Sequence, residues 1–195
     1  MSALNEIFGY LIQTVTSLYL LAMLLRFILQ LVRADFYNPI CQFLVKITNP
    51  LVLPVRRIVP GVAGLDLASL LLSIALQFIA ILALLMINSM PLPNPFLLLL
   101  WSLIGVVALL VNIYFFALLG MIILSWVAAG SKNPAIYLLH QITEPVMAPF
   151  RKALPSMGGL DFSPIVLFIL INITQIALRH VAASVGMYGG LVLGL

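Results

Sequence analysis

The chain has 195 residues, of which 64% are hydrophobic and 7% are charged, and its formal net charge is +4 at pH 7. A soluble domain is roughly half apolar and about a quarter charged, so this composition excludes an ordinary soluble globular protein. The single cysteine, Cys41, excludes an intrachain disulfide and a cysteine-based metal cluster. We therefore expect an integral membrane protein.

The first hydrophobic segment covers residues 4–32 and is expected to remain in the protein as a membrane span. Its polar lead carries Glu6 instead of a basic cluster, and its apolar stretch is longer than that of a signal peptide. Arg26, Gln30 and Arg33 follow at i, i+4 and i+7 spacing and share one helix face. Arg33 is expected to reach the headgroups; the deeper Arg26 either snorkels there too or has a functional role.

Three further segments are long enough to cross a bilayer, which takes about 20 helical residues: residues 65–87, 96–127 and 161–185. They are unbroken apolar runs, which favours helices over the alternating strands of a membrane β-barrel. The predicted fold class is an all-α membrane protein with four transmembrane helices.

The sequence repeats itself with a shift of 95 positions, which places Asn38-Pro39 on Asn133-Pro134 without a gap. The same shift places Pro50 on Pro145, Pro54 on Pro149, Arg56 on Arg151, and Asp66 on Asp161. We predict two tandem units, residues 1–90 and 91–195, each built as helix, polar connection and helix. Two spans per unit make the units parallel.

Basic residues gather in the two polar connections. Seven of the nine lie there: Arg33, Lys46, Arg56, Arg57, Lys132, Arg151 and Lys152. The positive-inside rule then predicts that both connections are cytoplasmic and both termini are outside. The expected location is the bacterial cytoplasmic (inner) membrane.

Each connection is expected to contain short amphipathic segments. In the second unit, Pro134 suits the first turn of a short helix over residues 135–142, which Pro145 should end because a residue before proline avoids the helical region. A second short segment should follow, either in the headgroup plane or as a re-entrant loop covered by protein.

The basic pairs of the connections have three candidate roles: topology with contact to anionic headgroups, a docking surface for a protein partner, or a dedicated anion site. The candidate interaction or lipid-facing residues are Pro50, Pro54, Arg56, Arg57, Pro145, Pro149, Arg151 and Lys152.

Asp66 and Asp161 each follow Gly-Leu at the start of a span. A carboxylate there can accept hydrogen bonds from free N–H groups and complements the positive end of the helix. We expect both to be helix caps, a role that is compatible with an ion pair to the preceding basic residues.

Gln77 and Asn172 are equivalent in the two units and lie about 16 Å into their helices, near the bilayer midplane. Such amides usually hydrogen-bond helices together, and the alternative is that they line a permeation path. Asn112 and Gln175 belong to the same class.

Sequence signals of catalysis are missing. His140 and His180 belong to no metal-ligand motif, and the HExxH, GxSxG and phosphate-loop motifs are absent. We expect no enzyme activity, no metal, no cofactor and no direct contact with nucleic acid.

The connections share a combined pattern: Thr-x-Pro, Pro-x-Arg-[Arg/Lys], Pro and Gly-x-Asp. It consists of Thr48, Pro50, Pro54, Arg56, Arg57, Pro60, Gly64 and Asp66, and again of Thr143, Pro145, Pro149, Arg151, Lys152, Pro155, Gly159 and Asp161, with Ser125-Trp126 before it. This pattern resembles that of the YggT/YlmG family of small membrane proteins, and the two copies cover nearly the whole chain. The copies diverge where Met121 replaces Arg26 and where Ser125-Trp126 replaces Gln30-Leu31.

The resemblance implies links to osmotic-stress tolerance, cell division or the envelope in bacteria, and to haem-cofactor assembly and nucleoid distribution in photosynthetic organisms. Together with the residues, it favours a non-enzymatic scaffold or assembly factor that presents its basic connections to a protein partner or anionic lipid, with a homo-oligomer as one possible state. The alternative is a small oligomeric channel or transporter subunit for ions or osmolytes. Its pore would be faced by Arg26, Gln77, Asn112 and Asn172.

Overall fold

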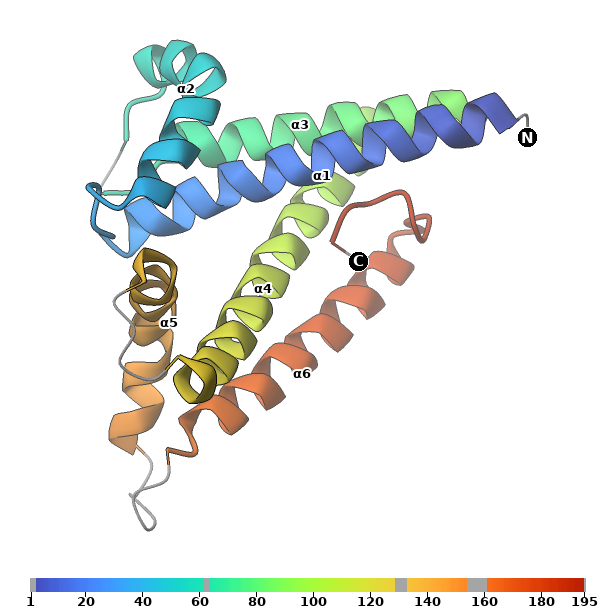
Figure 1. Ribbon diagram of the computed structural model, residues 1–195. Helices are drawn as coiled ribbons and strands as arrows, with labels where there is room; N and C mark the ends of the chain where they lie inside the picture. Colours follow the sequence, from blue (N-terminus) through green and yellow to red (C-terminus); the bar gives the residue numbers. More distant parts are fainter. Residues whose placement is uncertain (1–2, 62–63, 129–132, 154–160, 195) are drawn as a thin grey trace.

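The computed structural model of the protein describes residues 3–61, 64–128, 133–153 and 161–194. These residues form six helices and no strand (Figure 1): α1 (Ala3–Leu31), α2 (Pro39–Ile58), α3 (Leu67–Ile87), α4 (Pro95–Val127), α5 (Pro134–Ala153) and α6 (Ser163–Ser184). Lys132, Pro155 and Gly159, which the sequence patterns include, lie outside the described residues.

The four helices α1, α3, α4 and α6 are long and apolar enough to cross a membrane. This confirms the all-α fold with four transmembrane helices, and each predicted span agrees with a helix to within two residues at either end. The agreement follows from bilayer thickness, because a run of about 20 apolar residues has no other stable place in a chain of this size.

Helices α2 and α5 gather at one end of the four spans, whereas the N-terminus, the α3–α4 turn and the C-terminal segment lie toward the other end (Figure 1). Both connections therefore leave the spans on the same side. The turn at the opposite end is closed by Asn94, whose side chain accepts a hydrogen bond from the Leu97 N–H at 2.8 Å, with Pro95 at the first helical position.

Each connection holds one continuous helix of 20 residues, so the prediction of two short segments was wrong. Pro145 and Pro149 lie inside α5, as Pro50 and Pro54 lie inside α2. A proline inside a helix removes a hydrogen bond and clashes with the preceding turn.

Tertiary packing compensates for these prolines. The buried side of α2 runs from the first turn past Pro50, through Cys41, Leu44, Thr48 and Val52, at spacings of three and four residues. Breaking the helix at Pro50 would separate Val52 from this stripe and expose it.

A shared hydrophobic core joins the two units at the end where α2 and α5 lie. It includes buried residues of α1, α2, α4 and α5, among them Phe27, Leu44, Ile113 and Leu138. The side-chain amide of Asn38 also donates to the carbonyl oxygen of Pro134 at 2.8 Å, which ties the start of α2 to the start of α5. The two connecting helices therefore have a defined position relative to each other.

Candidate functional site

The first unit contains a group of three charged side chains: the buried Arg26 of α1, the partly exposed Arg56 in the last turn of α2, and the buried Asp66 before α3. Nε of Arg26 lies 3.3 Å from Oδ2 of Asp66, and Nη2 of Arg56 lies 2.8 Å from the same oxygen. Arg26 is 6% exposed and Asp66 is fully buried. Two guanidinium groups therefore share one carboxylate, and the group keeps one net positive charge.

Polar side chains of α1 and α2 complete this group. Nη1 of Arg26 donates to Oγ1 of Thr48 at 2.7 Å and to Oδ1 of Asn49 at 2.8 Å. Nη2 of Arg56 donates to Oε1 of Gln30 at 2.8 Å. A buried charge is tolerated only with such partners. Arg26 therefore connects α1 to α2 and, through the carboxylate, to α3.

Asp66 is the N-cap residue of α3. Its carboxylate accepts hydrogen bonds from the N–H of Ser69 at 3.3 Å and from the Ser69 hydroxyl at 2.7 Å. Burial alone would raise the pKa of Asp66, but the hydrogen bonds from Ser69 and Arg56 outweigh it and hold the pKa below its ordinary value. The carboxylate is ionised at neutral pH.

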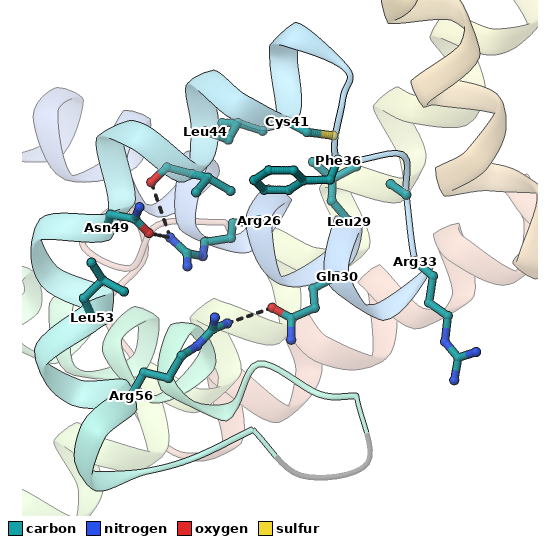
Figure 2. Close-up of a pocket in the computed structure, with 12 residues that line it drawn as sticks. Arg26, Leu29, Gln30, Arg33, Phe36, Cys41, Leu44, Asn49, Leu53 and Arg56 are labelled. Atoms are coloured by element: carbon teal, nitrogen blue, oxygen red, sulfur yellow. Dashed lines mark hydrogen bonds between the residues drawn. The ribbon is translucent and has the colours of Figure 1, made fainter.

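Beside this group lies a cavity of about 510 Å³ between α1, the α1–α2 loop and α2 (Figure 2). Its polar lining comes from Arg26, Gln30, Arg33, Asn49 and Arg56. The rest is apolar, from Leu29, Ala34, Phe36, Cys41, Leu44, Val45 and Leu53. None of these lining residues is acidic, so the cavity suits an anion that also carries an apolar part.

The second unit has a different charge arrangement at the equivalent positions. Nε of Arg151 lies 3.0 Å from Oδ2 of Asp161, and Nη1 of Arg151 lies 2.8 Å from Oε1 of Glu144. Met121 replaces Arg26, and its sulfur accepts a hydrogen bond from Thr143 at 3.0 Å. One guanidinium thus meets two carboxylates, which reverses the sign of the local charge.

Asp161 does not occupy the expected cap position. Phe162 is the N-cap residue of α6, and Asp161 lies one residue earlier, where its Oδ1 accepts from the N–H of Ser163 at 2.9 Å. Hydrogen bonds from Ser163 and then from Arg151 lower the pKa of Asp161. The same contact with Asp161, followed by that with Glu144, raises the pKa of Arg151.

The basic pairs divide into a paired and an unpaired member. Arg56 and Arg151 form the ion pairs above, whereas Arg57 and Lys152 are exposed and have no ion pair with any described residue. The four candidate prolines of the connections, Pro50, Pro54, Pro145 and Pro149, are also exposed.

The intramembrane amides bind the C-terminal segment. Nε2 of Gln77 lies 3.3 Å from the carbonyl oxygen of Leu193, and Nδ2 of Asn112 lies 2.8 Å from that of Gly194. Gln175 also donates to Oδ1 of Asn112 at 2.8 Å, which is a contact between spans of the expected kind.

The equivalence of the two units fails at Asn172. Gln77 is fully buried, whereas Asn172 is exposed and donates to the carbonyl oxygen of Phe168 in its own helix at 2.8 Å. Asn172 therefore makes no hydrogen bond to another helix among the described residues.

Sequence reasoning missed the role of the C-terminal segment. Nε1 of Trp101 donates to the carbonyl oxygen of Val185 at 3.1 Å, and Nε2 of Gln13 lies 2.6 Å from that of Gly190. The glycine-rich end of the sequence was the available signal, because Gly186, Gly190 and Gly194 adopt positive φ and let the chain turn back on the helices.

Within the described parts of the chain, no three His, Cys, Asp or Glu side chains come together in a way that could hold a metal ion. The charged side chains of the site are held by ion pairs and helix caps.

Comparison with known proteins identifies a family and close relatives of the chain. The sequence model of the CCB3/YggT family matches the chain twice, at residues 5–87 and 100–182. An uncharacterized protein of Pseudomonas aeruginosa is 50% identical over 189 residues, which cover 96% of each chain. The uncharacterized protein YggT of Escherichia coli K12 is 38% identical over 180 residues, covering 91% of this chain and 92% of the relative. No solved structure matches significantly.

Proposed function

The chain belongs to the CCB3/YggT family, and from this premise we propose that it is a non-enzymatic scaffold or assembly factor of the bacterial inner membrane. It presents α2 and α5 at the cytoplasmic surface to a protein partner. Osmotic-stress tolerance, cell division and cofactor assembly are processes in which such a scaffold would act.

The observation that carries this proposal is the placement of the two unpaired basic side chains. Arg57 and Lys152 are equivalent in the two units, lie in the last turns of α2 and α5, and are exposed. Their neighbours Arg56 and Arg151 are engaged in ion pairs that fix the ends of the helices. The unpaired side chains are thus held on an ordered surface and available to an acidic partner.

The exposed apolar side chains of α2 support its placement at the membrane surface. Phe43, Leu51 and Ile58 are 59%, 42% and 83% exposed, and Leu51 and Ile58 share one side of the helix at i, i+7 spacing. A helix with one side on protein, one apolar exposed side and a basic end is typical of the headgroup region.

The hydrogen bonds of the polar intramembrane residues favour a scaffold over the channel alternative. Gln77 and Asn112 bind the C-terminal backbone, and Arg26 binds Asp66. A pore would need these groups to face water and ions.

In vivo photocrosslinking tests the proposal. A photoreactive amino acid at Ile58 or Ala153 should capture a partner in otherwise wild-type protein, and the double variant Arg57→Gln/Lys152→Gln should lose the captured product. Arg179→Gln is the matched control, because Arg179 is exposed on α6 and is not in α2 or α5. If the same products form in the double variant and the control, the proposed docking surface is wrong.

A further inference from the structure

We infer that the cavity between α1 and α2 binds the phosphate group of an anionic membrane lipid. This inference rests on one part of the proposed function, the placement of α2 at headgroup level. It does not require that the protein captures a protein partner. The groups that would hold the phosphate are Arg26 and Arg56, with Asn49 and Gln30 beside them and Arg33 at the mouth (Figure 2).

The charge balance of the cavity favours an anion. Asp66 neutralises only one of the two guanidinium groups that it contacts, those of Arg26 and Arg56. Arg33 adds another positive charge to the lining, and its side chain points away from the other two arginines (Figure 2). Because Arg26 is 6% exposed, its guanidinium cannot rely on bulk water to offset this excess charge.

The arginines also have unused hydrogen-bond donors. A guanidinium carries five N–H groups. Arg26 donates through Nε and Nη1, and Arg56 donates through Nη2. Among the described residues, no acceptor contacts Nη2 of Arg26 or Nη1 of Arg56, and Nε of Arg56 is buried without a partner. A phosphate group can therefore accept one hydrogen bond from Nη2 of Arg26 and another from Nη1 of Arg56.

The second unit contains an internal counterpart of the proposed ligand. Glu144, the equivalent of Asn49, places both carboxylate oxygens on Nη1 of Arg151, at 2.8 and 3.1 Å. In the second unit the protein therefore supplies a second carboxylate, that of Glu144, beside the Arg151–Asp161 ion pair. In the first unit the neutral Asn49 leaves that second anion to be supplied from outside.

The walls of the cavity favour a lipid over a soluble phosphate. Leu29, Leu44 and Leu53 line it together with Phe36. Phe36 and Leu53 are 60% and 49% exposed and continue the apolar surface outward. A free phosphate ion would gain nothing from these side chains, whereas the glycerol backbone and first acyl carbons of a phospholipid would pack against them.

The test uses the purified full-length protein in a non-ionic detergent. The probes are short-chain phosphatidylglycerol, short-chain phosphatidylcholine and inorganic phosphate, each titrated separately while bound lipid is counted by native mass spectrometry. The wild-type protein should bind phosphatidylglycerol in preference to phosphatidylcholine, and its thermal unfolding midpoint should rise with the bound fraction.

Asn49→Glu is the decisive variant, because it introduces the internal carboxylate of the second unit. We expect it to fold and to bind phosphatidylglycerol at least about tenfold more weakly than the wild type. This is the effect of losing one charge-assisted contact between the protein and the phosphate. Gln42→Glu is the matched control: it makes the same charge change on the exposed surface of α2, outside the cavity, and should bind like the wild type.

Two outcomes would overturn the inference. Equal binding by Asn49→Glu and the wild type would exclude the site, and equal stabilisation by inorganic phosphate and phosphatidylglycerol would exclude a lipid as its ligand. Should Asn49→Glu fail to fold, Arg33→Gln decides instead, because the exposed Arg33 side chain forms no hydrogen bond or ion pair with any described residue. Severalfold weaker binding by this variant supports the site, and unchanged binding excludes it. The crosslinking experiment with the Arg57→Gln/Lys152→Gln variant tests the proposed function separately. Failure of the lipid site and failure of the docking surface can therefore be distinguished.

Discussion

Nη2 of Arg56 lies 2.8 Å from Oδ2 of Asp66, and this ion pair joins the last turn of α2 to the first turn of α3. The equivalent pair in the second unit, Arg151 with Asp161, has a separation of 3.0 Å. Among the described residues it is the one ion pair that both units share, although burial, local charge and the neighbouring side chains differ between them. The arginine and aspartate of the repeated pattern therefore fix how the connecting helix returns to the membrane.

Burial predicts unequal costs for removing the two carboxylates. Asp66→Asn should destabilise the protein by about 3–5 kcal/mol, because it leaves two arginines, one of them buried, without their counter-ion. Asp161→Asn should cost at most about 1 kcal/mol, since Asp161 and Arg151 are 39% and 45% exposed and solvent screens their interaction. Thermal unfolding of both variants in the same detergent measures the difference, and equal shifts would contradict the assigned role of burial.

The lowered pKa of Asp66 predicts how stability depends on pH. A carboxylate whose pKa is lower in the folded state contributes its full stability above the unfolded pKa, about 3.9, and loses it as the pH falls through the folded pKa. The contribution of Asp66 to the thermal unfolding midpoint should therefore stay nearly constant between pH 7 and pH 5. It should decrease once the pH is lower than about 4. Subtracting the pH profile of Asp66→Asn from that of the wild type isolates the effect. The difference should be largest near neutral pH and shrink below about pH 4, and a difference that grows toward acid pH would have the wrong sign.

The close approach of the C-terminal segment to α4 predicts that Gly105 cannot carry a side chain. A Cβ atom at Gly105 would lie 2.5 Å from Cγ1 of Val192 and 2.6 Å from Nε2 of Gln77. Gly105→Ala should displace the segment, so a cysteine replacing the buried Val192 should become reactive to maleimide in a Cys41→Ser background.

The control for that experiment is a cysteine at Gly189, where an added Cβ meets no atom within 4 Å. It should react whether or not Gly105 is substituted. Continued protection of the cysteine at position 192 in Gly105→Ala would show that the segment tolerates the added methyl group.

Topology predicts opposite labelling at the two ends of the spans. In a Cys41→Ser background, a cysteine at the exposed Ser89 in the α3–α4 turn should react with an impermeant maleimide in intact cells. A cysteine at Tyr37, which is 86% exposed near the start of α2, should react only after lysis. The reverse pattern would invert the orientation derived from the positive-inside rule.

The candidate site was only partly predictable. Asp66 was expected as a cap from its place after Gly-Leu, and the cap is present. Its partnership with Arg26, 40 positions earlier, follows no helical spacing and depends on how α1 packs against α3. The pairing of Gln77 with Leu193 spans 116 positions and was unpredictable for the same reason.

The sequence by itself determined the four spans, because an apolar run of membrane length satisfies its backbone only as a helix in lipid. It also determined that the unit occurs twice, since a register of prolines, an arginine and an aspartate repeats without a gap. Tertiary structure decided that α2 continues past Pro50 and Pro54, because burying one uninterrupted stripe outweighs the local cost of proline. It also decided which arginines are paired, because a buried charge takes whichever partners the packed helices bring within reach.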